Sequence, residues 1–149
     1  MKRLGSLILI AAVATAMGAG ASFAGQAPAA ARKLVAPVRG EANVEITKPD
    51  TKVIGNDVVT IIYVKNVATA PIAGFKIEEN WYNKAGDAMG GDVYRHPRPL
   101  QVGETIQITL KTPRARVIGR NNQYQFSHAN GVVKPKMVPK LEVPKPTTD

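Results

Sequence analysis

Apolar and β-branched residues dominate two neighbouring stretches of the chain, and each stretch ends in turn-forming residues. Residues 58–65 are apolar on both alternating sets of positions, which is typical of a central strand. Residues 74–82 place Phe75, Ile77 and Trp81 on one face and mainly polar residues on the other. We therefore expect two adjacent strands of a sheet core, with Trp81 as a buried aromatic.

Alternation elsewhere predicts further strands at residues 42–47, 89–94, 105–110 and 123–128. The first of these is expected at an edge, the Gly90-Gly91 pair predicts a bulge, and Asn130-Gly131 predicts a hairpin into Val132 and Val133. No stretch after residue 24 requires a helix. Six to seven short strands favour an all-β fold, a single antiparallel Ig-like β-sandwich, with a small closed barrel such as an OB-fold as the alternative.

The N-terminal 24 residues have the three parts of a secretory signal peptide. Lys2 and Arg3 form the charged region, an apolar run follows to about residue 19, and Ser22 and Ala24 suit cleavage after Ala24. An uncleaved membrane anchor is the alternative. Beyond the signal peptide (1–24), we expect a flexible linker (25–40), the β-sandwich domain (41–138) and an extended proline- and lysine-rich tail (139–149). The predicted location is periplasmic or secreted.

The chain is basic and has no cysteine, so neither disulfides nor thiol chemistry are available to an exported fold. Removing Lys2 and Arg3 from the formal net charge of +9 leaves about +7. Outside the cytoplasm such a charge suits an anionic envelope component, or another exported protein, better than nucleic acid. Charge that serves solubility alone is the competing interpretation.

Between residues 57 and 110 the chain resembles the FxLYD-like, Ig-like domains of bacterial exported proteins. The matching pieces are Val64-Lys65-Asn66, then Trp81-Tyr82-Asn83 with Gly86, then the turn at residues 100–105. Glu79 stands where the family has Phe, Trp81 where it has Leu, Asn83 where it has Asp, and Val102 where it has Pro. The resemblance implies an Ig-like fold and an exported setting, and because the family has no common enzymatic activity it implies no catalytic residue.

Two histidines are the first candidates for site chemistry, since imidazole and carboxylate groups bind zinc. His96 and His128 lie far apart in the sequence without paired-ligand spacing. A loop histidine beside Pro97 and a strand histidine with a backbone partner are the simpler expectations. The carboxylates that could complete a metal site are Glu78, Glu79, Asp87 and Asp92.

Glu79 is the most unusual acid, because it falls in phase with Phe75, Ile77 and Trp81, and an unpaired buried carboxylate is costly. We expect strand twist or a bulge to bring it to the sheet end, where it meets Arg or Lys. Ser127 beside His128 lacks the G-x-S-x-G context of a nucleophile. The sequence therefore predicts no catalytic, cofactor-binding or metal residue, and no cofactor.

Five arginines gather in the two connections that flank the predicted strand at residues 105–110, and guanidinium groups suit phosphate and carboxylate. Because the connections leave opposite ends of one strand, we expect two patches rather than one. Scattered, solvated charge is the alternative. The candidate anion-binding residues are Arg95, Arg98, Arg114, Arg116 and Arg120.

These features favour a non-enzymatic binding or assembly module of the cell envelope that contacts anionic polymer or lipid. Two alternatives stay open. A small periplasmic hydrolase or metal-dependent enzyme would require Glu79 and a histidine to line one pocket, and a purely structural accessory domain would present a surface without a groove.

Overall fold

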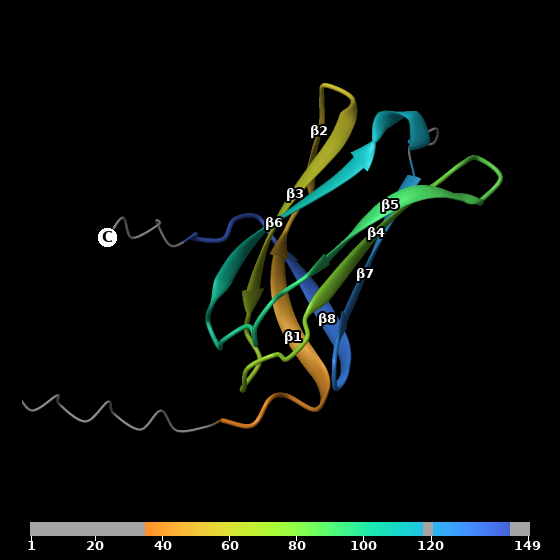
Figure 1. Cartoon of the computed structure of the whole chain (residues 1–149). Coiled ribbons are helices and arrows are strands. Elements are labelled where there is room, and N and C mark those ends of the chain that lie inside the picture. The colour runs from red at the N-terminus through yellow and green to blue at the C-terminus, as the bar shows by residue number, and fades with distance from the viewer. Residues whose placement is uncertain (1–34, 118–120, 144–149) are drawn as a thin grey trace, which may run out of the picture. The chain divides into compact units, whose positions relative to one another are not determined.

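The computed structural model describes residues 35–117 and 121–143, in which the chain forms eight strands and one 3₁₀ turn (Figure 1). No α-helix occurs in these ranges, which confirms the all-β class, and no helix there is long and apolar enough to span a bilayer. The elements are β1 (Gly40–Thr47), β2 (Asp50–Ile54), β3 (Asp57–Asn66), β4 (Lys76–Tyr82), β5 (Ala88–Arg95), β6 (Thr105–Pro113), η1 (Arg114–Arg116), β7 (Asn121–His128) and β8 (Gly131–Val138).

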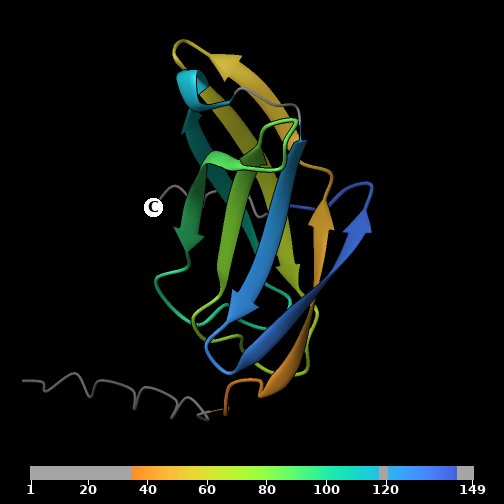
Figure 2. The same ribbon diagram turned by 90° about the vertical axis from the view of Figure 1, so that its right-hand side faces the viewer.

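The strands form one curled sheet whose two halves face each other (Figures 1 and 2). In one half, β6 pairs with one edge of β3, while β1 and β2 follow one another along the other edge. In the other half, β4 pairs with β5 and β7, and β7 joins β8 at a hairpin. β1 connects the halves, because it also pairs with β8 along its whole length.

The predicted purely antiparallel sandwich of six to seven strands is wrong in two respects. β1 and β8 run parallel, from Gly40 opposite Gly131 to Thr47 opposite Val138, so the sheet is mixed. β1 is therefore an interior strand rather than the expected edge. The additional strand is β2, whose five residues are all exposed and therefore lack the alternation that marks the other strands.

The central position predicted for the strand at residues 58–65 is confirmed, because β3 is flanked along its length by β6 and by β1 and β2. Ile62 and Val64 point into the interior and are fully buried. They pack in one core cluster with buried apolar side chains from both halves, which include Val44, Phe75 and Ile77. Apolar burial between the halves is therefore the main source of stability.

β4 and β5 carry the predicted inward face and the predicted bulge. Ile77, Glu79 and Trp81 are all buried, as their alternation required. Trp81 lies outside the main core cluster, in which Phe75 is the fully buried aromatic. The register between β4 and β5 shifts between Trp81 and Tyr82, which skips one residue next to Gly90.

The two ends of the curled sheet, β5 and β6, approach each other without a backbone ladder. Asp92 of β5 accepts a hydrogen bond from the backbone N–H of Lys111 of β6 at 2.7 Å. A side-chain contact thus takes the place of strand pairing at this junction. On the other edge of β5, Gly91 is required by the close pairing with β4, since a Cβ on it would lie 1.9 Å from the backbone oxygen of Glu79.

Candidate functional site

The structure places the candidate arginines in two separate regions. Arg95 ends β5 and Arg98 lies in the following loop, whereas Arg114 and Arg116 form η1 beyond the other end of β6. At about 3.4 Å per residue, the nine residues of β6 span roughly 30 Å. The arginines therefore do not form one patch. Arg120 lies outside the described residues.

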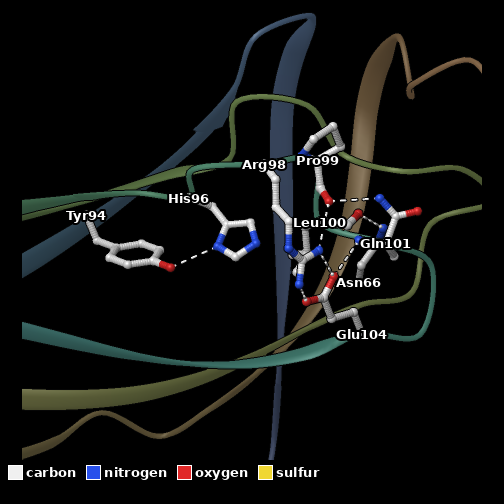
Figure 3. A network of polar contacts seen from close by, with 8 residues as sticks. All are labelled: Asn66, Tyr94, His96, Arg98, Pro99, Leu100, Gln101 and Glu104. Atoms are coloured by element: carbon white, nitrogen blue, oxygen red, sulfur yellow. Dashed lines mark hydrogen bonds and ion pairs between the residues drawn. The ribbon is translucent and has the colours of Figure 1, made fainter.

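Arg98 is held by a neighbouring acid in the loop between β5 and β6 (Figure 3). Its guanidinium forms two contacts with the Glu104 carboxylate, of which Nη1 to Oε2 measures 2.9 Å. Glu104 Oε2 also accepts the backbone N–H of Gln101 at 2.8 Å. The hydrogen bond from Arg98 is the main reason that the pKa of Glu104 lies below its ordinary value. The positive charge of Arg98 is thus already compensated within the loop.

Asn66, at the end of β3, anchors the same loop to the sheet. Its side-chain amide donates to the carbonyl oxygens of Leu100 at 2.9 Å and Ala70 at 3.2 Å, and its side-chain oxygen accepts the N–H of Ala68 at 2.8 Å. Asn66 is fully buried, so these bonds satisfy its polar atoms. This structural role of Asn66 was not predicted, although Asn66 was recognised as a strand-ending residue.

Tyr94 and His96 form the other half of this loop cluster, with the tyrosine hydroxyl 2.8 Å from His96 Nδ1 (Figure 3). Burial lowers the pKa of His96 and raises that of Tyr94. The second ring nitrogen of His96, Nε2, is buried and has no hydrogen-bond partner among the described residues. The neutral form of the ring is favoured in this environment.

Glu79 is the most deeply buried acid of the described chain and differs most from expectation. Its exposed fraction is 1%, and no arginine or lysine within residues 35–117 and 121–143 forms an ion pair with it. The expectation that it reaches a cation at the sheet end is therefore wrong. Four neutral groups donate to its carboxylate: Thr60 at 2.9 Å, Tyr124 at 3.0 Å, Asn122 at 3.3 Å and Thr112 at 3.4 Å.

These donors come from both halves of the sheet. Thr60 belongs to β3 and Thr112 to β6, whereas Tyr124 lies on β7 beside Glu79 on β4. Burial, and after it the charge of the Glu79 carboxylate, raises the pKa of Tyr124 to about 12. The Glu79 cluster thus crosses the interior and joins the two halves by hydrogen bonds.

Neither histidine shares this cluster, which bears on the hydrolase and metal-enzyme alternative. His128 Nε2 lies 2.8 Å from the carbonyl oxygen of Gly40, so it is the strand histidine with a backbone partner. His96 bonds to Tyr94. Within residues 35–117 and 121–143, no three His, Asp or Glu side chains are placed to hold a metal ion. Glu79 and the histidines therefore do not line one pocket.

The η1 end presents the arginines that remain available. Arg114 and Arg116 are exposed, and neither forms an ion pair with a described carboxylate. The backbone N–H of Arg114 donates to the Asn56 carbonyl at 2.8 Å, which fixes η1 against the turn between β2 and β3. A hollow of about 580 Å³ lies at this junction and is lined by Asn56, Asp57, Pro113, Arg114 and Ala115.

A wider hollow of about 670 Å³ lies where the chain leaves β8. Lys48 and Lys140 line it together with Tyr63, Thr47 and Glu142. Leu141 is buried at its margin, which holds this part of the predicted tail against the domain. The chain beyond β8 therefore contacts the domain at Leu141, and residues 144–149 of the predicted tail lie outside the described residues.

The chain is similar to a solved structure, although its sequence matches no family model and no curated protein. A solved structure of IrmA from Escherichia coli is similar over 68% of this chain and 98% of that one, with 12% sequence identity and a TM-score of 0.42.

Proposed function

We propose that the protein is an exported, non-enzymatic binding or assembly module built on an Ig-like, FxLYD-like domain, and that it binds an anionic polymer or lipid of the cell envelope. The signal-peptide pattern and the basic charge support the setting. Two facing halves joined by strand β1 are compatible with the Ig-like class. The hydrogen bonds that commit Glu79 and His128 to structural roles support a binding role over catalysis.

The observation that carries this proposal is the contrast between paired and unpaired arginines. Arg98 is compensated by Glu104, whereas Arg114 and Arg116 are exposed beside a hollow and form no ion pair with a described acid. The desolvation cost is small when an exposed guanidinium group binds a phosphate or carboxylate, and charge-assisted hydrogen bonds form. The η1 pair is therefore the favoured contact, and Arg95, also exposed, offers a separate one.

Cosedimentation of the mature protein with two materials tests the proposal: vesicles with and without anionic phospholipid, and purified envelope polymer. Binding to either anionic material supports the proposal, and the two arms distinguish lipid from polymer. Binding through exposed charge should weaken strongly as the Debye length falls from about 10 Å at 0.1 M salt to about 3 Å at 1 M.

A matched pair of double variants assigns the surface. Arg114→Gln with Arg116→Gln should reduce binding several-fold, whereas Arg98→Gln with Lys134→Gln removes the same formal charge from residues already in ion pairs and should have a smaller effect. Equal losses in the two variants would show that only net charge matters. Binding that ignores salt would contradict the proposal altogether.

A further inference from the structure

β7 and β8 pair only beside their hairpin turn and then diverge, as both views of the ribbon show (Figures 1 and 2). Their register contains two pairs, Ser127 with Val132 and His128 with Gly131. Beyond these, β7 pairs with β4 and β8 pairs with β1, each on its opposite edge. The facing edges at residues 121–126 of β7 and 134–138 of β8 have no strand partner within the described chain, and we call them the open seam.

Side chains at the open seam face the core and are nevertheless uncovered. Met137 lies directly opposite Ile46, which is buried, yet Met137 is 61% exposed. Directly paired residues of neighbouring strands point to the same face of a sheet. On the other side of the seam, Tyr124 and Phe126 lie opposite the buried Glu79 and Ile77 but are only half-buried. The interior is therefore incompletely closed along this line.

The geometry of the seam specifies the form of an occupant. Unpaired strand edges present backbone N–H and C=O groups that pair with another extended chain. Strand addition to such an edge takes its affinity from the backbone bonds and its specificity from alternate side chains. A strand seated there would direct every second side chain onto Met137, Tyr124 and Phe126, so those positions should be apolar.

The pairing of β1 with β8 shows which side chains lie favourably beside the outward-facing residues of β8. The inward side chains of β1 are apolar, whereas its outward residue Glu41 forms an ion pair of 2.6 Å with Lys134. Lys136 also points outward from β8 and forms no ion pair with a described acid. An outward acid on an added strand would meet these lysines, and opposite charges on neighbouring strands are stabilising.

We propose that the open seam is an acceptor site for an extended segment of another exported polypeptide in which apolar and acidic residues alternate. The chain's own residues 25–34 fit less well, since they contain Arg32 and Lys33 and no acid. A second copy fits less well too, because β1, the strand of matching chemistry, is already paired on both edges. This site is separate from the arginines of η1, so either proposal can fail without the other.

The test uses the mature protein and a synthetic peptide of about eight residues in which valine and glutamate alternate, a typical strand length. Amide hydrogen exchange should show new protection at residues 121–126 of β7 when the peptide binds. A peptide with lysine in place of glutamate should bind at least several-fold more weakly. If residues 121–126 gain no protection, or the lysine peptide binds equally well, the proposal is wrong.

Two variants on β8 provide the matched control. Met137 and Val132 are exposed to similar extents, 61% and 59%, but only Met137 faces the core side. Met137→Gln should weaken peptide binding about tenfold, as loss of one buried apolar side chain predicts, and Val132→Gln less than about twofold. Equal effects would overturn the proposal. So would peptide binding that appears only after residues 25–34 are deleted, or a dimer whose dissociation deprotects residues 121–126, because these results assign the seam to the chain itself.

Discussion

The cluster around Glu79 and the loop cluster around Glu104 satisfy the same functional group in opposite ways. Glu79 is buried between the halves of the sheet, and its donors among the described residues are all hydroxyl and amide groups. Glu104 lies in the loop between β5 and β6 and is held by the guanidinium of Arg98 and one backbone N–H. One carboxylate joins distant strands, and the other joins residues within a single loop.

This difference predicts which part of the protein each carboxylate stabilises. Donors to Glu79 come from β3, β6 and β7, so losing its carboxylate would leave buried donors unpaired in both halves at once. Partners of Glu104 can turn to water when the pair is broken, because Arg98 is exposed. We therefore expect the Glu79 cluster to determine global stability and the Glu104 cluster to affect mainly the loop. Four measurements separate the two roles.

The largest effect is expected from Glu79→Ala, which removes the common acceptor of four donors. The free energy of unfolding should fall by about 3 to 5 kcal/mol, as when one member of a buried polar network is deleted. Urea denaturation measures the loss. Glu78→Ala is the control, since Glu78 is the neighbouring acid on the outer face and pairs with Lys76, and it should cost less than about 1 kcal/mol. Similar costs for the two variants would contradict the role of the Glu79 cluster.

If Glu79→Ala does not fold, Glu79→Gln gives the same information on a smaller scale. Glutamine keeps the side-chain shape but replaces one acceptor oxygen with an NH₂ group that faces hydroxyl donors. The expected cost is about 1 to 3 kcal/mol, the range for one unsatisfied buried group. A glutamine variant as stable as the parent would show that the carboxylate is not required.

Tyr124 provides the next effect, which appears at alkaline pH. Its pKa of about 12 in the folded protein exceeds the ordinary 10.0. Between these values the unfolded chain has lost a proton that the folded protein keeps, so stability falls as pH rises through this window. Tyr124→Phe should cost about 1 kcal/mol at neutral pH and should make the decline from pH 10 to 12 shallower. Thermal unfolding of both proteins across that range measures it, and parallel profiles would refute the prediction.

The sequence predicted the strands well where the alternation was local. Ile106, Ile108 and Leu110 marked β6, and the two-sided apolarity of residues 58–65 marked β3 as central. The parallel pairing of β1 with β8 could not be predicted in this way. Its paired residues, such as Ala42 and Val133, are adjacent in space but lie near opposite ends of the domain's sequence. The residues around one of them give no indication of the other.

The candidate site was predictable only in part, for a similar reason. Alternation placed Glu79 on the inner face, as observed, but the cost of burying a charge suggested a cation as its partner. Its actual partners, such as Thr60 and Thr112, are ordinary strand residues whose convergence on Glu79 depends on how the halves pack. Arg98 and Glu104 are six positions apart, so their pairing could have been suspected from the loop sequence.

A smaller effect is expected at acid pH from Glu104. Its folded pKa lies below the ordinary 4.5, so its contribution to stability is present above that value and is lost as pH falls through the folded pKa. Glu104→Gln should lower stability slightly at pH 7, less than Tyr124→Phe does. The difference between parent and variant should shrink below about pH 4.5 as the carboxylate is protonated. A difference independent of pH would show that charge plays no part.

The smallest effect is a shift in the titration of His96, which reports the Glu104 cluster without unfolding it. Burial lowers the pKa of His96 below the ordinary 6.5, while the charge of Glu104 raises it and that of Arg98 lowers it. Glu104→Gln should therefore lower the midpoint of the His96 ring further, and Arg98→Gln should raise it, each by a fraction of a pH unit. Ring proton resonances followed by NMR between pH 4 and 8 measure both shifts, with His128 as the internal control because it bonds to Gly40 in another part of the sheet. Shifts of the same sign in the two variants, or equal shifts at His128, would mean that the loop rearranges as a whole and that the charges of Arg98 and Glu104 do not act on His96 separately.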